Sequence, residues 1–170
     1  MKPPGLRIAP LQADQVEMLA GLARTIWQRH YPGIISQAQI DYMLQQRYRP
    51  GIIQQQLAQP GNGWDVAYTQ AGMIGFCHYL LDTGPDQVKL DKLYVHPDHQ
   101  RHGIGAALLA QVEVRARAQG RGMIHLRTNK RNQAALAAYR KYGFDIVAEV
   151  VTAIGGGFVM DDYVLEKVLR

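Results

Sequence analysis

A strand-like stretch followed by a glycine-bearing turn and a helix constrains the fold of this chain more than any other feature. Residues 88–95 are rich in apolar side chains and end at His96–Pro97. The segment 100–105, Gln-Arg-His-Gly-Ile-Gly, follows, and apolar residues then recur with helical spacing until Gly120. A helix N-terminus offers unpaired N–H groups, and glycines let a phosphate approach them closely. Two interpretations follow: a cradle for a phosphorylated cofactor, or an ordinary strand-to-helix connection.

Apolar periodicity and turn residues predict the other elements. In chain order we expect a strand, two helices with a short third one, three strands, a helix, a strand, a helix and two strands. The predicted strands are 6–10, 64–69, 73–81, 88–95, 123–128, 144–152 and 158–167. The predicted helices are 14–30, 36–49, 52–58, 103–119 and 132–142. Asp14 with Glu17, and Ser36 with Gln39, have the spacing of capping boxes at two helix starts.

This order of elements predicts an α/β (α+β) fold with a mixed, mostly antiparallel sheet of about six or seven strands. The unit 88–128 reads as strand, helix and strand, which predicts a parallel pair with a right-handed crossover. The two strands at 64–81 form a hairpin, so they are antiparallel. Helices on both faces satisfy both patterns. With 170 residues and 47% hydrophobic content, we expect one domain over residues 1–170.

Composition narrows the compartment and the class of partner. No run of 18 apolar residues occurs and the first residues lack the apolar segment of a signal peptide, so we expect a cytoplasmic protein without a membrane partner. The single cysteine, Cys77, lies in an apolar run and is expected to be buried and inert. Net charge is +5, and Glu113 is the only acid between Arg101 and Lys141. A small polyphosphate fits this basic span better than nucleic acid, because no nucleic-acid-binding motif is present.

Two motifs on consecutive elements carry a family resemblance. The first is Leu-Tyr-Val-His-Pro at 93–97 with Gln-Arg-His-Gly-Ile-Gly-Ala at 100–106. The second has Asn132, Ala135 and Tyr139 and ends at Gly143–Phe144. Both resemble signatures of the GCN5-related N-acetyltransferase (GNAT) family, and the order of strands also matches. The motifs cover residues 88–144, and the flanking elements match in type and order only.

The resemblance implies that acetyl-CoA is the cosubstrate and that no metal takes part. Backbone amides of the glycine turn would hold the diphosphate, and the strand at 93–95 would splay from the strand at 123–128. The exposed strand backbone would then bind the pantetheine arm, and an amide near Val95 would face the thioester carbonyl. The residues implied in acetyl-CoA binding are Leu93, Tyr94, Val95, Gln100, Arg101, His102, Gly103, Ile104, Gly105, Ala106, Asn132 and Tyr139.

The resemblance also implies roles for two side chains of the second motif. Asn132 would contact the pantetheine arm, cap its helix, or do both. Tyr139 lies seven residues on, hence on the same helix face, and would act as the general acid that protonates the departing thiolate. The alternative for Tyr139 is a tyrosine packed in the core.

Residues 89 and 91 are the positions to consider for removal of the proton from the amine. Many family members carry Glu eleven residues before the motif glutamine, and this chain has Lys89 there. Asp91 is the candidate catalytic carboxylate, on the same strand face as Lys89 if no bulge intervenes. A Lys89–Asp91 surface pair and a water chain that ends on backbone or on Asp91 are the alternatives.

The first helices and the last hairpin would form the wall for the acceptor. The candidate substrate-binding residues are Tyr31, Tyr42 and Asp162. An inward Asp162 would favour a cationic substrate, and the alternative is a carboxylate that is solvated or paired with arginine. His96, His99 and His102 do not have the spacing of a metal site.

We therefore expect an N-acetyltransferase that acts on a primary amine of a small molecule, such as a polyamine or amino acid, or of a peptide, by direct attack. The alternative is a non-catalytic domain that senses acyl-CoA. The strand at 158–167 is expected to offer an edge for a homodimer.

Overall fold

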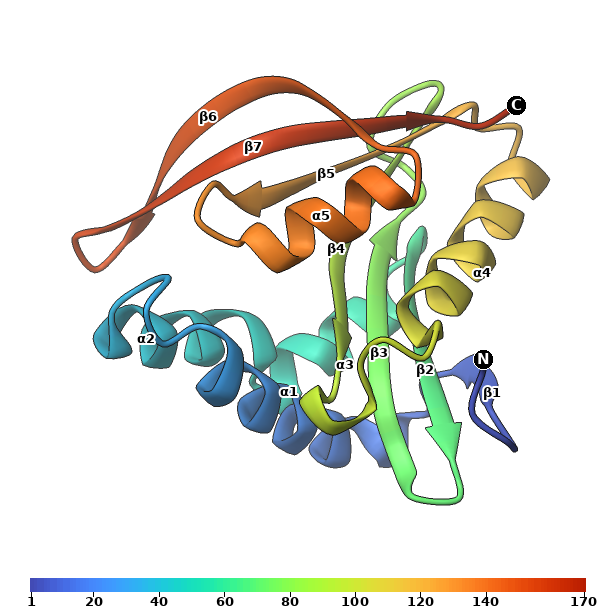
Figure 1. Cartoon of the computed structure of the whole chain (residues 1–170), viewed down its shortest axis with the longest axis horizontal. Helices are drawn as coiled ribbons and strands as arrows, with labels where there is room; N and C mark the ends of the chain where they lie inside the picture. Colours follow the sequence, from blue (N-terminus) through green and yellow to red (C-terminus); the bar gives the residue numbers. More distant parts are fainter.

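The computed structural model describes residues 1–170 and contains one seven-stranded sheet in the order β1-β2-β3-β4-β5-β7-β6 (Figure 1). The strands are β1 (Arg7–Pro10), β2 (Asn62–Thr69), β3 (Gly72–Leu80), β4 (Gln87–Val95), β5 (Met123–Asn129), β6 (Asp145–Gly155) and β7 (Phe158–Val168). The helices are α1 (Val16–His30), α2 (Gln37–Tyr48), α3 (Pro50–Ala58), α4 (Ile104–Ala118) and α5 (Gln133–Lys141). The predicted order of elements and the mixed sheet are confirmed.

Strands β4 and β5 form the one parallel pair of the sheet. Their register covers only Gln87–Lys89 against Met123–His125, and the remainder of β4 has no partner on that side. Strand β3 pairs with β4 up to Val95 on the other side. Figure 1 shows β5 leaving the direction of β4 at a steep angle, with α5 beside the opening. The predicted splay in the middle of the sheet is confirmed.

Two apolar cores lie on the two faces of the sheet. One joins α4 and α5 to the sheet through Ile104, Leu108 and Leu136. The other packs α1, α2 and α3 against β2 and β3, with Trp27 and Ile40 at its centre. This arrangement follows from residues spaced three or four apart on each helix, which place one apolar stripe against the strands. Helices therefore cover both faces, as predicted.

The two predicted capping boxes are not formed as expected. Asp14 does not cap α1, because a short 3₁₀ turn (Ala13–Gln15) precedes the helix and the backbone N–H of Gln12 donates to Gln15 Oε1 at 3.0 Å. Ser36 does cap α2 and accepts from the N–H of Gln39 at 3.2 Å. The Gln39 side chain, however, donates to the carbonyl of Val159 instead of completing the box.

Strand β7 is not an edge strand, which corrects the expected dimerisation edge. It lies between β5 and β6 and pairs with both, so its backbone groups are used on both sides. The two edges of the sheet are β1 and β6. Cys77 is fully buried in β3, and burial raises the pKa of its thiol. None of the helices is both long and apolar enough to cross a membrane.

Candidate active site

The glycine turn after β4 presents a row of free backbone amides. Gly103 caps α4 with a left-handed φ of 76°, and Arg101 also has a positive φ of 65°. Within α4 the first hydrogen bond closes from the N–H of Ala107 to the carbonyl of Gly103. The N–H groups of residues 101–106 donate to no acceptor in the protein. They lie at the positive end of the helix dipole, so the turn is suited to an anion.

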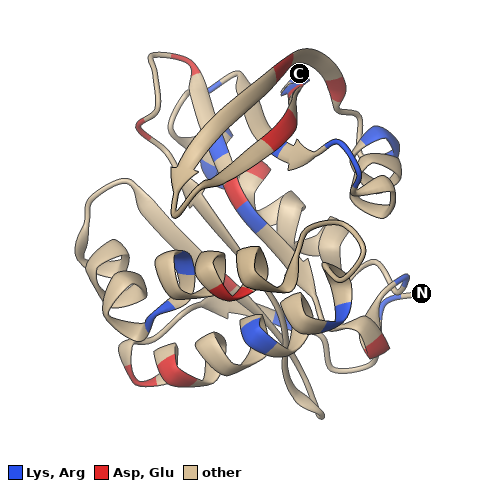
Figure 2. Cartoon of the chain, turned by 90° about the vertical axis from the view of Figure 1, so that its left-hand side faces the viewer, with Lys and Arg blue, Asp and Glu red and all other residues tan.

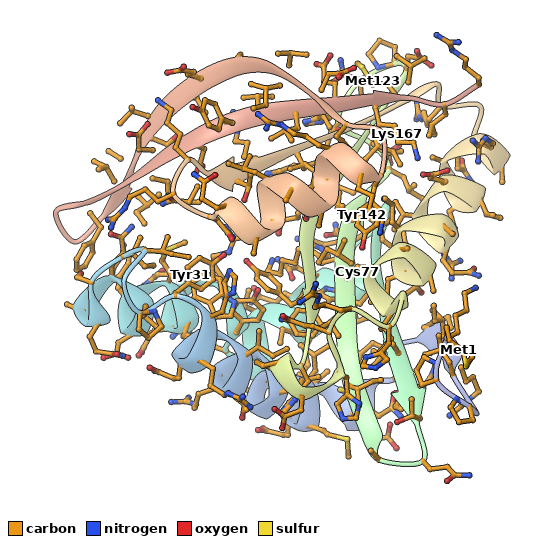
Figure 3. All side chains as sticks on the ribbon, in the orientation of Figure 1. Met1, Tyr31, Cys77, Met123, Tyr142 and Lys167 are labelled. Atoms are coloured by element: carbon orange, nitrogen blue, oxygen red, sulfur yellow. The ribbon has the colours of Figure 1, made fainter.

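Gly105 is where this turn is most tightly packed. A side chain on Gly105 would place its Cβ 3.3 Å from the hydroxyl of Tyr142 and 3.9 Å from a methyl group of Val95. Tyr142 ends α5, and Figure 3 labels it at the C-terminal end of that helix, close to α4. A glycine at this position therefore lets the first turn of α4 pack closely against Tyr142 and the end of β4.

The opening between β4 and β5 exposes strand backbone next to the turn. The N–H of His96 donates to the carbonyl of Ile74 in β3. Because backbone groups alternate along an antiparallel strand, Leu93 and Val95 turn theirs toward the opening. The Gln100 amide donates to the carbonyl of Val95 at 3.1 Å, which ties the turn to the end of the strand.

A pocket occupies the opening and continues beneath it to the helices. Strand β4 contributes residues 89–94, and α2 contributes Gln39, Met43 and Arg47, which are spaced four residues apart and share one helix face. The remaining lining residues are Trp27, Tyr31, Ile35, Arg127, Thr128, Asn129, Asn132, Ala135, Tyr139 and Met160. Leu93, Tyr94, Asp91, Asn132, Tyr139 and Tyr31, all predicted from sequence, thus meet in one place.

Asn132 and Tyr139 project from the same face of α5 into this pocket. Asn132 caps the helix, because its Oδ1 accepts from the N–H of Ala135 at 3.3 Å, and it also lies 3.0 Å from His30 Nε2. The amide nitrogen of Asn132 has no partner in the protein. The hydroxyl of Tyr139 likewise makes no hydrogen bond with the protein, and burial raises its pKa. Its phenol is therefore protonated at neutral pH.

A bulge in β4 determines the charges at the other end of the pocket. Tyr79 pairs with Leu90 but His78 pairs with Lys92, so Asp91 is the extra residue. Asp91 and Lys92 consequently share the helix-covered face with Lys89. The Asp91 carboxylate forms ion pairs with Arg47, Lys89 and Lys92.

The ionisation of this cluster follows from its contacts. The Asp91 carboxylate also lies 3.0 Å from His78 Nδ1. This contact and the surrounding cations outweigh the effect of burial and hold the pKa of Asp91 well below its usual value. Burial lowers the pKa of Lys92 to about 8, and the Asp91 charge opposes that shift. Lys92 also lies 5.1 Å from the ring of Trp64, in cation–π contact. Asp91 is thus an ionised counterion with weak affinity for a further proton.

The aromatic wall of the pocket contains a hydrogen-bonded tyrosine pair. The hydroxyls of Tyr31 and Tyr94 are 2.7 Å apart, and Trp27 packs against Tyr31 with ring centroids 4.3 Å apart. Figure 3 labels Tyr31 on the side of the molecule formed by α1 and α2. Burial raises the pKa of Tyr31 well above the usual value. Tyr94 therefore faces the helices, whereas Leu93 and Val95 face the other core.

Two of the predicted acceptor-binding residues lie outside the lining. The Tyr42 hydroxyl donates to the carbonyl of Ile154 at 2.7 Å and its ring packs on Phe158, so Tyr42 joins α2 to the β6–β7 turn. Asp162 is 1% exposed, and its Oδ1 is buried without a partner. Burial raises the pKa of Asp162 to about 6.

Arg47, Lys92 and Arg127 are pocket residues that the sequence analysis missed. Arg47 lies on a separate helix, 44 residues before Asp91, so no spacing links the two residues. Strict alternation would place Lys92 on the same face as Leu90, in the opposite core. Only the bulge turns Lys92 to the face that carries the pocket. Arg127 had a signal, because it alternates with the buried Leu126 and Thr128 of β5 and so points to the other face.

Comparisons with known proteins agree with this geometry. The chain is 24% identical to a spermidine N(1)-acetyltransferase of Thermoplasma acidophilum over 160 residues, which is 92% of this chain and 96% of that protein. The crystal structure of the PaiA N-acetyltransferase from Thermoplasma acidophilum in complex with coenzyme A superimposes with a TM-score of 0.83 at 22% identity, covering 96% and 99% of the two chains. A GCN5-related N-acetyltransferase from Rhodopseudomonas palustris gives a TM-score of 0.80 at 21% identity over 99% of each chain.

The family model described as "Acetyltransferase (GNAT) family" matches residues 23–144, which includes the glycine turn, the splayed strands and both α5 side chains. Together with the fold, this match means that the chain is an acyltransferase and belongs to the GNAT family.

Proposed function

We propose that this protein transfers the acetyl group of acetyl-CoA to a primary amine by direct attack of the amine nitrogen. One observation carries the proposal: the free amides of residues 101–106 lie at one end of an opening in the sheet that leads to Tyr139. An anion site, an extended slot and a protonated hydroxyl are therefore aligned in the order of the parts of a nucleotide thioester.

The residues present fit acetyl-CoA. The amides of the glycine turn would bind its diphosphate, with Arg101 adding a charge-assisted contact. The backbone of Leu93 and Val95 would pair with the amides of the pantetheine arm, and the free amide nitrogen of Asn132 would donate to the same arm. When bound, acetyl-CoA supplies an activated acyl group on a thiol leaving group.

The chain's own groups would assist both ends of the transfer. The amine nitrogen forms the new bond to the acyl carbon, and the carbon–sulfur bond breaks. The backbone N–H of Val95 would stabilise charge on the carbonyl oxygen. Tyr139 would donate its phenolic proton to the departing sulfur and would regain a proton from the acceptor nitrogen through solvent.

The amine must lose a proton before it attacks. Asp91 is a poor base, because its pKa is lowered by His78 and the surrounding cations. The cations of the same cluster, Arg47, Lys89 and Lys92, would instead disfavour an ammonium ion beside them and release its proton to water. We infer that Asp91 acts as a positioning residue that holds these cations in place, and that no carboxylate base is needed.

A thiol-release assay with acetyl-CoA and a panel of primary amines tests this function. Product formation that depends on both substrates is the expected result. Saturable binding of acetyl-CoA without thiol release for any amine would support the alternative, a sensor of acyl-CoA. Tyr139 favours the enzyme, because a sensor has no use for an unpartnered hydroxyl at the end of the slot.

A further inference from the structure

The acceptor end of the pocket contains more positive than negative groups. Its lining includes four cationic side chains and one carboxylate, and these are Arg47, Lys89, Lys92, Arg127 and Asp91. Figure 2 looks into this side of the molecule and shows blue and red segments close together on the strand between the helices below and the hairpin above. Asp162, outside the lining, forms no ion pair with these cations, although the charges of Arg127 and Arg47 act to lower its pKa. The lining itself therefore keeps more cations than carboxylates.

The single lining carboxylate is already fully engaged. Asp91 Oδ2 contacts Arg47 Nη2 at 3.3 Å and also pairs with Lys92, while Oδ1 pairs with Lys89 at 3.4 Å. One carboxylate is thus shared by three cationic side chains. His78 also touches Oδ2. Burial lowers the pKa of His78, so its ring is neutral at pH 7 and does not change the charge of the cluster.

Arg47 has a donor aimed at nothing in the protein. Its Nη2 reaches both the carbonyl and the carboxylate of Asp91 at 3.3 Å. Its Nε is buried and has no hydrogen-bond partner. A buried N–H of a charged group without an acceptor is costly, and such groups are usually satisfied by a ligand or a water molecule.

Arg127 is the one cation of the lining that does not pair with Asp91. It projects from β5 on the face that the pocket occupies, and its only hydrogen bond goes from Nη1 to the hydroxyl of Thr152 at 3.4 Å. It forms no ion pair, although Asp162 lies on the same face of the neighbouring strand. Its guanidinium therefore has most of its five donors available.

These cations are too distant from the glycine turn to serve the diphosphate. Lys89 and Val95 are six residues apart on β4, which corresponds to roughly 20 Å of extended strand. Asp91 and Lys92 lie at the same far end, and Arg47 reaches them from α2. The anion that they would bind is accordingly not part of acetyl-CoA but belongs to the acceptor.

On the basis of the proposed acetyl transfer, we propose that the acceptor is a primary amine that carries an anionic oxygen group, a carboxylate or a phosphate. Arg47 and Arg127 bind that group, because a guanidinium fork matches both oxyanions. Lys89 and Lys92 add positive potential. The amine end points along β4 toward Leu93 and the opening in the sheet. A polyamine, in contrast, would place a second ammonium ion beside these cations.

Matched acceptors test the proposal directly. We would measure kcat/KM by thiol release for 4-aminobutyrate, butylamine and 1,4-diaminobutane, and for phosphoethanolamine and ethanolamine. We expect each anionic amine to exceed its neutral partner by at least about tenfold, because hydrogen bonds to charged groups have this magnitude. The diamine should be the poorest acceptor. Equal or higher values for butylamine, ethanolamine or the diamine would overturn the proposal.

Variants localise the effect. Arg127→Gln and Arg47→Gln should reduce the ratio of kcat/KM for the anionic amine to that for its neutral partner. In Arg127→Glu, kcat/KM for 1,4-diaminobutane should exceed kcat/KM for 4-aminobutyrate. Arg24→Gln, an exposed arginine of α1 outside the pocket, makes the same change of charge and should keep the ratio. An unchanged ratio in the Arg127 and Arg47 variants would contradict the assignment of these residues.

The two proposals fail in different ways. Thiol release that favours neutral or cationic amines would overturn the anionic acceptor and leave acetyl transfer intact. If no amine supports thiol release, acetyl transfer itself is wrong. Calorimetry with N-acetyl-4-aminobutyrate and N-butylacetamide in the presence of coenzyme A tests the anion site without turnover. Tighter binding of the carboxylate would support the site, and equal binding would overturn it.

Discussion

Asp91 and Lys92 are neighbours in sequence, yet their side chains form an ion pair on one face of β4. Consecutive residues of a regular strand point to opposite faces, so the pair exists only because the bulge inserts Asp91 opposite the His78–Tyr79 step. The bulge thereby brings a carboxylate and a nearly buried ammonium group to the acceptor end of the pocket. Bulges of this kind commonly re-aim side chains near active sites.

Removal of the Asp91 charge should destabilise the fold. Asp91→Asn leaves Arg47 and Lys92 without their counterion, and breaking a buried pair in this way costs about 3–5 kcal/mol. We expect a large decrease in the midpoint of urea denaturation at pH 7. Lys89→Ala is the matched control, because its ion pair is more exposed and should contribute less than about 1 kcal/mol. Similar losses in both variants would show that the cluster is not a coupled unit.

Tyr139→Phe should lower kcat by roughly 100-fold or more, the usual range for loss of a general acid. KM for acetyl-CoA should change little, since the ring remains and the hydroxyl makes no hydrogen bond with the protein. Steady-state kinetics of thiol release measure both constants. Tyr163→Phe, on β7 and outside the pocket lining, controls for loss of a tyrosine hydroxyl. Full activity of Tyr139→Phe would remove Tyr139 from the mechanism.

Gly105→Ala should weaken binding of acetyl-CoA by about tenfold, or ~1.4 kcal/mol. The new methyl group meets the hydroxyl of Tyr142 and the side chain of Val95, so it displaces one of them or rises into the cradle. Calorimetric titration with coenzyme A measures the effect. Gly21→Ala in α1 has open space around the new methyl group and should keep the affinity while it stabilises the helix. Unaltered affinity in Gly105→Ala would mean that the ligand does not approach this turn.

The parts of the site that local spacing determines were predictable from sequence. Asn132 and Tyr139 are seven residues apart, and two helical turns place them on one face whatever the tertiary structure does. The glycine turn and the splay of β4 from β5 were likewise expected from the two motifs and are present. Strand alternation also offers a Lys89–Asp91 pair as one alternative, and the structure contains this contact at 3.4 Å.

The parts that depend on long-range register were not predictable. Lys92 reaches the pocket only through the pairing of β3 with β4, and Arg47 arrives from a separate helix. The hairpin signal predicts that β6 and β7 are neighbours, but it does not determine which of the two pairs with β5. The prediction that β7 forms an edge of the sheet was therefore wrong, because β7 lies between β5 and β6. Tyr42 is expected in the acceptor wall, and the structure places it outside the pocket lining, with its hydroxyl donating to the carbonyl of Ile154 in β6.

Asp162→Asn should stabilise the protein at neutral pH. Burial raises the pKa of Asp162 from 3.8 to about 6, so the folded state disfavours the carboxylate that forms above pH 6. Stability associated with this group is complete below about pH 4, decreases as the pH rises toward 6, and stays reduced above it. The amide removes that penalty and should raise the free energy of unfolding at pH 7.5 by roughly 1–3 kcal/mol. Denaturation curves at several pH values from 4.5 to 7.5 should show the gain shrinking as the pH falls, whereas Asp161→Asn, on the exposed face, should follow the wild type more closely. A gain that does not depend on pH would contradict a buried, unpartnered carboxylate at position 162.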